Sequence, residues 1–488
     1  MNRDFNTGYI LKILGSLLII ESIFLSLVVF VDLYYKENTG TAFLISAGIT
    51  FLAGSVSLFF GRNASQNIGK REGSLIVSLT WVLFSVFGML PFILTGSIPR
   101  VADAFFETMS GFTTTGSSIL DNIESLPHAV LFWRSTTHWI GGLGIIVISM
   151  ALLPVFGFSG FQIFSAEATG PTKDKIHPKI GETAKRLLAI YLALTFAETI
   201  LLRIAGMNWF DAICHSFGTI ATGGFSTKQN SIAFYNSPAV EYIIILFMVF
   251  SGINFSLYYF LFKLKIKKII RNEELRVYLL IIFAFTLLLT VSRIDFHNLT
   301  TLDLGTTIRE TLFVVTSTIS TTGFVTTDYN IWPVFTWFLI IILMMIGSSA
   351  GSTAGGMKVS RVMLTLKYSY YEFKQIIHPN AVFPVRYNGH ILRDNVMGRI
   401  FSFVVLYIIM ILLGSLLLSF TGLGFIESFS AQITAISNVG PALSLLGPTS
   451  SFSDIPEISK WILSFSMLIG RLELFTVLVL FTPVFWKR

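Results

Sequence analysis

The chain contains Phe112-Thr113-Thr114-Thr115-Gly116, and three related segments follow this one. Each combines Thr, Ser, Asn or Gly residues, ends in glycine and lies between two long apolar stretches. A segment that recurs in the same surroundings indicates an internal repeat. The three later segments are Ile220-Ala221-Thr222-Gly223-Gly224, Ile319-Ser320-Thr321-Thr322-Gly323 and Ile436-Ser437-Asn438-Val439-Gly440.

An acidic residue supports the alignment of the four segments. Asp103, Asp211, Glu310 and Glu427 each lie thirteen residues before the final glycine. The residues in between are mostly apolar and sufficient for about two to three helical turns, much less than a membrane span. A carboxylate is favourable near the positive N-terminal end of a helix. We therefore expect four short helices, each beginning near its acidic residue.

The composition places these segments in a membrane protein. Of 488 residues, 53% are hydrophobic and only 12% are charged, whereas soluble domains carry about 25% charged residues. The mean hydropathy is +0.73. Helices are expected to cross the membrane, because the apolar runs reach the length of about 20 residues that a helical span needs. The single cysteine, Cys214, excludes an internal disulfide and a thiolate metal cage.

The apolar runs predict how the chain is organised. We expect an all-α integral membrane protein with an N-terminal two-helix hairpin and four pseudo-symmetric units, each made of a span, a re-entrant pore loop and a second span, around one pore. The first run is too long for a signal peptide and is expected to be retained. The expected units are 1–66, 67–170, 171–270, 271–390 and 391–488. The expected spans are 9–34, 41–60, 73–96, 129–153, 185–205, 240–262, 275–292, 334–366, 396–420 and 458–486.

Charge predicts the orientation of the chain. Most of the 34 Lys and Arg residues fall in alternate loops on the side that also holds both ends of the chain, so both termini are expected in the cytoplasm. Acidic residues are more frequent on the outer side, where they favour the approach of cations, although each of them could simply solvate its loop. The net charge of +7 is dispersed and forms no nucleic-acid-binding motif.

The four glycine-terminated segments suggest a chemistry. Non-helical backbone is tolerated at membrane depth only where it lines a water-filled path or is buried in protein. Four such loops around one axis would present a ring of carbonyl oxygens, which is how a dehydrated potassium ion is held in a selectivity filter. Threonine hydroxyls would add oxygen ligands. The alternative is that the segments are ordinary polar turns outside the membrane.

A second unusual stretch interrupts the third unit. Residues 334–346 provide about 20 Å of helix against a hydrocarbon core of about 30 Å, so this helix cannot finish crossing. We expect an irregular loop in the membrane, just below the filter. The alternative is a close-packed helix crossing, in which small residues let two helices approach. The stretch reads Gly347-Ser348-Ser349-Ala350-Gly351-Ser352-Thr353-Ala354-Gly355-Gly356.

Arg471 lies in the middle of the last apolar run. An arginine at that depth is costly unless it is paired or hydrated, so it should face the interior of the protein. There it could bind carbonyl oxygens of the 347–356 loop, and its charge would impede cations below the filter. The alternative is a structural ion pair with Glu198 or Glu21, which also lie at membrane depth.

The sequence resembles the Trk/Ktr/HKT superfamily of potassium transporters, most closely the bacterial TrkH type. The resemblance covers the whole chain and implies potassium uptake across the bacterial inner membrane. It also implies that Gly116, Gly224, Gly323 and Gly440 are the four filter glycines and that 347–356 is the gate. Plant members of the superfamily with serine at the first of these positions are associated with sodium permeation, so the resemblance implies that Gly116 favours potassium over sodium. Further matching motifs are His138-Trp139-Ile140-Gly141-Gly142-Leu143-Gly144, Gly351-Ser352-Thr353-Ala354-Gly355-Gly356-Met357-Lys358 and Gly470-Arg471-Leu472-Glu473.

The fourth filter segment departs from this pattern, because Asn438-Val439 stands where the others have Thr or Gly. The resemblance further implies a homodimer and a cytosolic nucleotide-binding ring of the TrkA type, since no nucleotide motif lies on this chain. The basic stretches 173–186, 263–276 and 358–393 would meet that ring, although anionic lipid would explain them equally well. Potassium is the expected transported ion.

Other classes of function are less consistent with the sequence. No H-E-x-x-H, G-x-S-x-G or P-loop motif is present, which disfavours an enzyme. A secondary transporter with broken helices predicts inverted repeats, whereas the four units here have the same orientation. Within the same superfamily, a symporter for potassium or sodium with proton or sodium coupling remains the alternative.

Overall fold

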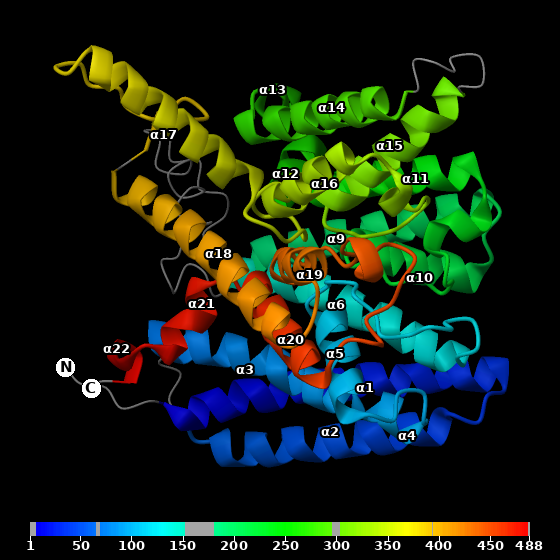
Figure 1. Cartoon of the computed structure of the whole chain (residues 1–488). Helices are drawn as coiled ribbons and strands as arrows, with labels where there is room; N and C mark the ends of the chain where they lie inside the picture. The colour runs from blue at the N-terminus through cyan, green and yellow to red at the C-terminus, as the bar shows by residue number, and fades with distance from the viewer. Residues whose placement is uncertain (1–5, 65–68, 152–179, 295–302, 393, 487–488) are drawn as a thin grey trace.

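The computed structural model describes residues 6–64, 69–151, 180–294, 303–392 and 394–486. Helices make up nearly all of the regular structure (Figure 1), and the prediction of an all-α integral membrane protein is confirmed. Within the described residues, six helices are long and apolar enough to cross a membrane, or up to eight if each of two bent helix pairs counts as one span. Residues 173–179 of the first basic stretch lie outside the described residues.

The N-terminal hairpin consists of α1 (Thr7–Tyr35) and α2 (Gly40–Gly61), which pack side by side (Figure 1). Small residues let the two helices approach closely: a Cβ added at Gly54 would lie 2.9 Å from the carbonyl oxygen of Gly15. The Asp32 carboxylate closes the turn, accepting hydrogen bonds from the Thr39 N–H (2.8 Å) and hydroxyl (2.6 Å).

The rest of the chain repeats a pattern in which a short helix lies between longer ones. The first set is α3 (Lys70–Gly88), α4 (Leu90–Leu94), α5 (Val101–Phe112) and α6 (His128–Ala151). The second is α9 (Ile180–Ile204), α10 (Trp209–Ile220), η1 (Ser231–Tyr235), α11 (Pro238–Gly252), α12 (Phe255–Phe262) and α13 (Ile266–Ile270). The third is α14 (Glu273–Arg293), α15 (Leu304–Ile319), η3 (Tyr329–Ile331), α16 (Val334–Ile346) and α17 (Val359–Ile377). The fourth is α18 (Asp394–Phe420), α19 (Phe425–Ser437), η4 (Ser444–Leu446), α20 (Glu457–Arg471), α21 (Phe475–Leu478), η5 (Val479–Phe481) and α22 (Pro483–Trp486).

Two of the expected spans bend sharply instead of continuing as one helix. The run 240–262 bends by 99° between α11 and α12, and the run 458–486 bends by 110° between α20 and α21. At the first bend, Asn254 caps α12 by accepting a hydrogen bond from the Ser256 N–H (2.9 Å). At the second bend, Glu473 and Leu474 adopt positive φ angles of 57° and 34°. A right-handed helix requires negative φ angles, so the helix ends there. The expected break after 346 is present, since α16 ends at Ile346 and α17 begins at Val359.

A two-stranded hairpin on the chain between α17 and α18 was not expected. Its strands β1 (Arg386–Tyr387) and β2 (His390–Ile391) pair antiparallel. The expected boundary between the third and fourth units, at 390/391, falls inside this hairpin. Nearby, α17 projects from the body of the molecule (Figure 1).

Apolar side chains divide between the interior and the outer surface. The short helices are buried among the long ones, and Phe106, Phe112 and Ile433 on them are fully buried. Large apolar residues such as Phe30, Phe283 and Leu416 are instead exposed on the outsides of long helices. An exposed apolar surface of this kind is expected where helices face lipid.

Candidate functional site

The four glycine-terminated segments adopt one conformation. Each follows the C-terminal end of a short helix, namely α5, α10, α15 or α19. In each, the residue two before the glycine lies in the left-handed region, and the glycine itself has a positive φ angle. The φ angles are 51° and 86° for Thr114 and Gly116, 57° and 81° for Thr222 and Gly224, 57° and 78° for Thr321 and Gly323, and 55° and 110° for Asn438 and Gly440.

The same hydrogen bonds end the four short helices. The N–H of the residue just before each glycine donates to the carbonyl five residues earlier, which closes the last helical turn. The four segments differ in sequence but share this backbone hydrogen bond. The pairs are Thr115 to Ser110 (2.8 Å), Gly223 to Gly218 (2.8 Å), Thr322 to Ser317 (2.9 Å) and Val439 to Thr434 (3.0 Å).

The four glycines pack against one another's loops in a closed ring. A Cβ added at Gly116 would overlap the carbonyl oxygen of Gly223, one at Gly224 that of Thr322, and one at Gly323 that of Val439. The ring closes where a Cβ at Gly440 would lie 2.9 Å from the carbonyl oxygen of Thr115. All four glycines line one cavity of about 80 Å³. Only glycine combines this positive φ with so close an approach.

Polar side chains of the loops are also buried. Thr113, Thr114, Thr115, Thr222, Ser320, Thr321, Thr322, Ser437 and Asn438 are all fully buried. In the first and third loops the hydroxyls flanking the left-handed residue bond to each other, Thr113 to Thr115 at 2.8 Å and Ser320 to Thr322 at 2.7 Å. The loops therefore place both carbonyl and hydroxyl oxygens in the interior of a membrane protein.

The departure in the fourth loop has a structural explanation. Asn438 is the residue in the left-handed conformation, which asparagine tolerates better than most residues. Its Nδ2 donates to the Thr115 hydroxyl of the first loop (2.9 Å) and to the Met467 carbonyl of α20 (3.0 Å). Asn438 thus joins the fourth loop to the first. Among the described residues, the equivalent threonines, Thr114, Thr222 and Thr321, form no such bond to a neighbouring loop.

Three of the four acidic residues begin their helices as expected. Asp103, Asp211 and Glu427 lie in the first turns of α5, α10 and α19. Asp103 pairs with Lys460 of α20 (2.6 Å), and Asp211 accepts a hydrogen bond from the Thr227 hydroxyl (2.6 Å).

Glu310 is a correction, because it is not in the first turn of its helix. α15 begins at Leu304, where the Asp303 carboxylate accepts hydrogen bonds from the N–H groups of Gly305 (3.1 Å) and Thr306 (3.3 Å). This cap starts the helix earlier than in the other units. Glu310 instead pairs with Arg293 of α14 (2.7 Å).

The stretch 347–356 is an irregular segment that packs against the glycine-terminated loops and the ends of their helices. It bonds to the ends of two short helices: the Ser348 hydroxyl donates to the Ile319 carbonyl of α15 (2.8 Å), and the Thr353 hydroxyl to the Ile220 carbonyl of α10 (3.0 Å). The Gly355 N–H donates to the Thr321 hydroxyl (2.7 Å). A Cβ at Gly355 would overlap the Ser437 carbonyl at the end of α19.

Other residues of this stretch turn the chain or stay buried. Gly347, Gly351 and Gly356 have positive φ angles, and Ser349 and Ser352 are buried. The Ala350 N–H donates to the Glu274 carboxylate of α14 (2.7 Å), which also accepts from the Tyr387 hydroxyl of β1 (3.1 Å). One buried carboxylate therefore connects the stretch to the β1–β2 hairpin.

Arg471 binds the stretch rather than a carboxylate. The residue is 3% exposed, and its guanidinium donates to the Thr353 carbonyl (2.6 Å) and to the Gly141 carbonyl of α6 (3.4 Å). Within the described residues, Arg471 forms no ion pair with Glu198 or Glu21. The nearby Glu473 pairs with Arg361 of α17 (2.7 Å).

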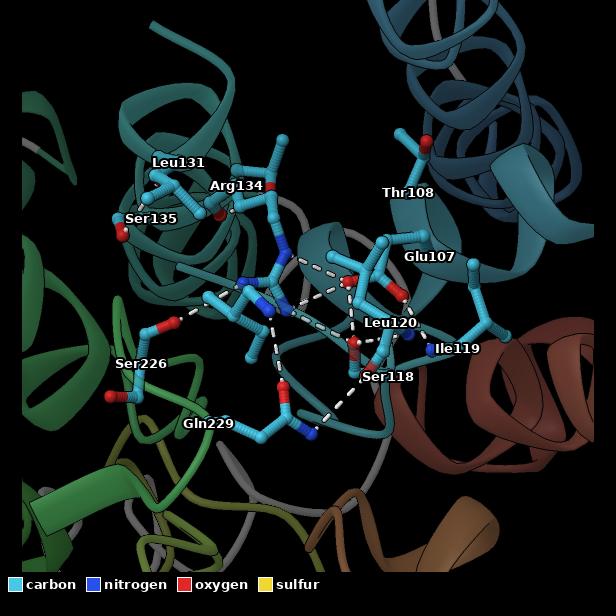
Figure 2. Close-up of polar contacts among 12 residues, drawn as sticks. Glu107, Thr108, Ser118, Ile119, Leu120, Leu131, Arg134, Ser135, Ser226 and Gln229 are labelled. Carbon is cyan, nitrogen blue, oxygen red and sulfur yellow. Dashed lines mark hydrogen bonds and ion pairs between the residues drawn. The ribbon is translucent and has the colours of Figure 1, made fainter. Parts of the chain in front are cut away.

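A buried ion pair that was not predicted from the sequence lies beside the first and second glycine-terminated loops. Figure 2 shows Arg134 of α6 paired with Glu107 of α5, both almost completely buried. The two charged groups also bond to Ser118 and Ser226, which lie two residues after Gly116 and Gly224. The available signal was the occurrence of an arginine and a glutamate in apolar segments close to the first glycine-terminated loop.

Comparisons with known proteins cover nearly the whole chain. A TrkH family model, described as a cation transport protein, matches residues 39–488. The Trk system potassium uptake protein TrkH of Escherichia coli (strain K12) is 39% identical over 483 residues, 98% of this chain and 99% of that protein. TrkG of the same organism is 35% identical over 460 residues, 94% of each chain. The crystal structure of the potassium transporter TrkH from Vibrio parahaemolyticus has a TM-score of 0.90 at 35% identity, covering 99% of this chain and 100% of that one.

Proposed function

The chain belongs to the TrkH family of cation transport proteins, and on that premise we propose that it takes up potassium ions across a bacterial inner membrane. The family consists of transporters rather than enzymes. Relatives that match along almost their full length are named as potassium uptake proteins. The ion passes through one central pore, and both termini of the chain lie in the cytoplasm.

The observation that carries the proposal is the closed ring of four glycine-terminated loops. Each filter glycine packs against the carbonyl of the residue before the next loop's glycine. Carbonyl oxygens arranged around one axis replace the hydration shell of a dehydrated potassium ion. The four filter loops therefore select the ion, and the C-terminal ends of α5, α10, α15 and α19 add negative partial charge at the same depth.

The segment 347–356 closes the pore below the filter in this proposal. It is bonded to the ends of α10 and α15, and it packs against the end of α19. Arg471 holds its Thr353 carbonyl and places a positive charge below the filter. Opening requires these hydrogen bonds to break, so the gate and Arg471 act on the same closed state.

Two partners belong to the proposal: a second copy of the chain and a cytosolic nucleotide-binding ring of the TrkA type. Both rest chiefly on the family resemblance. The projecting helix α17 exposes an apolar stripe of Leu366, Tyr370, Phe373 and Ile377, a surface that a second copy would cover. Exposed basic residues between α12 and α14, such as Lys267 and Lys268, are available to the ring or to anionic lipid.

Reconstituted flux tests the proposal directly. In liposomes with an imposed membrane potential and no proton or sodium gradient, potassium uptake should exceed sodium uptake. Equal fluxes of the two ions would contradict potassium selection by the loops. Absence of flux until a proton or sodium gradient is added would favour a coupled symporter.

One observation favours that symporter as the second candidate. Glu21 of α1 is 1% exposed, and neither of its carboxylate oxygens has a hydrogen-bond partner among the described residues. A protonatable group at membrane depth is a feature of proton-coupled transporters. If protons are coupled to uptake through Glu21, Glu21→Gln should abolish proton-dependent uptake. If uptake is driven by the membrane potential alone, the same variant should leave the potassium flux unchanged.

A further inference from the structure

A second ring of hydrogen bonds joins neighbouring loops just after their filter glycines. The carbonyl oxygen two residues after each filter glycine accepts a hydrogen bond from a group in the preceding unit, and the first unit is joined in the same way to the fourth. The donors are the Phe452 N–H to Ser118 (2.8 Å), the Arg134 guanidinium to Ser226 (3.2 Å), the Ile232 and Ala233 N–H groups to Val325 (3.1 Å each) and the Tyr329 hydroxyl to Ala442 (3.0 Å).

Arg134 supplies the one charged donor among these four links. Its Nη1 donates to the Ser226 carbonyl of the second loop, while its Nη2 donates to the Ser118 hydroxyl of the first (3.1 Å). Figure 2 shows the guanidinium between these two loops. It also stacks 4.1 Å from the ring centre of Phe225, the residue after Gly224. A single rigid group therefore sets the spacing between the first two filter loops.

Glu107 completes this arrangement from the other side. Its carboxylate accepts from Arg134 Nε (2.8 Å), from the Ser118 hydroxyl (3.0 Å) and from the Ile119 N–H (2.9 Å). The ion pair is buried, with side-chain exposures of 1% and 0%. Hydrogen bonds to ionised groups are about twice as strong as neutral ones, so this link holds its loops more firmly than the three neutral links hold theirs.

We propose that Arg134, held by Glu107, is a positioning residue that fixes the first and second filter loops and thereby sets the discrimination between potassium and sodium. Arg134 acts through the loops that surround the ion and not by coordinating it. This inference rests on the proposed filter. It assigns to one buried side chain the task that backbone groups or a tyrosine perform at the other three links.

The test substitutes Arg134 by lysine and measures potassium and sodium flux in liposomes, normalised to folded protein. Lysine retains the charge but lacks the fork that reaches Glu107, Ser118 and Ser226 together. The potassium-to-sodium flux ratio should fall about tenfold, a change equivalent to about 1.4 kcal/mol. The matched control is Arg309→Lys, because Arg309 forms an Arg–Glu pair of the same length, 2.8 Å, with Glu241 of α11 rather than with a filter loop.

A merely structural role predicts that both lysine variants lower the unfolding temperature and leave the flux ratio unchanged, and that result would overturn the inference. Ser118→Ala decides the question if Arg134→Lys does not fold, because it removes a loop contact and keeps the ion pair intact. The potassium-to-sodium flux ratio of Ser118→Ala should also fall, by a smaller factor than that of Arg134→Lys. An unchanged ratio would again contradict the inference. A wild-type protein without selectivity would instead refute the proposed filter itself.

Discussion

Gly116 is the residue at which the proposed filter can be tested most simply. Its φ angle of 86° is unfavourable for any side chain, and a Cβ would overlap the Gly223 carbonyl of the neighbouring loop. Gly116→Ser should therefore separate two carbonyls of the ring and lower the potassium-to-sodium flux ratio by about tenfold, or about 1.4 kcal/mol of discrimination. Liposome flux of both ions measures the ratio.

Gly96 provides the control for this substitution. Its φ angle is 72°, but no atom lies within 4 Å of an added Cβ. Gly96→Ser carries the backbone strain of about 1 to 3 kcal/mol without the clash, so it should reduce stability and leave the ratio unchanged. If Gly116→Ser behaved in the same way, Gly116 would not belong to the filter.

Arg471 is expected to hold the gate closed. Replacing it by alanine removes the hydrogen bond to the Thr353 carbonyl and a positive charge below the filter. Basal potassium flux per folded molecule should rise about five- to tenfold, in the range of typical conformational couplings. Arg471→Lys keeps the charge but cannot span both carbonyls, so its flux should be intermediate. Unchanged flux with reduced folding yield would indicate a structural role.

Residues differ in how well the sequence predicts them. The equivalence of the four loop-ending glycines was predictable because the four copies support one another, and a positive φ with a close approach demands glycine. Their role in a filter stays a prediction. The role of Arg134 was not predictable, because nothing local in the sequence shows that its side chain reaches a carbonyl of one loop, at Ser226, and a hydroxyl of another, at Ser118. The prediction that Glu310 lies in the first turn of its helix was wrong, because the Asp303 cap, seven residues earlier, lengthens α15.

At the scale of an element, the segment 347–356 is the feature with the most direct test. Shortening it should free the pore below the filter and raise basal potassium flux. Because Arg471 acts on Thr353 within this segment, combining the shortened loop with Arg471→Ala should raise flux by less than the product of the two single effects. Multiplicative effects would mean that the loop and the arginine control different steps.

The broken helices show where periodicity fails as a guide. The break after Ile346 was predictable because the glycine-rich stretch is long and the helix before it is too short to cross. The bends after Gly252 and Arg471 occur within apolar runs of full length. They depend on tertiary contacts, such as the Phe255 N–H donating to the Gly351 carbonyl (3.0 Å), which the sequence pattern does not contain.

For the whole molecule, the sidedness predicted from Lys and Arg residues can be tested by labelling. In a Cys214→Ala background, a cysteine replacing exposed Asn122 should react with an impermeant thiol reagent from outside. A cysteine replacing exposed Lys268 should react only from the cytoplasmic side. Labelling of position 268 from outside would invert the proposed topology.

For the whole molecule, the sequence predicts an all-α membrane protein with four related loops, and it also shows that the fourth loop departs from the others at Asn438, but it does not show the contacts that join one loop to the next. Equivalent positions around the ring differ in chemistry: Asn438 replaces threonine in the fourth loop, and Arg134 replaces a neutral donor between the first two. A repeat in sequence predicts a similar backbone at each position. Which side chain joins one unit to the next depends on the packed structure.

The central claim is that the four loops together bind a dehydrated monovalent cation on one axis. Crystals of the protein soaked in rubidium or thallium, which substitute for potassium, should show anomalous density at the centre of the ring formed by the carbonyls of Thr115, Gly223, Thr322 and Val439, and soaking in sodium should displace it poorly. Absence of density between these carbonyls, in crystals where the ion is bound elsewhere in the pore, would contradict the account.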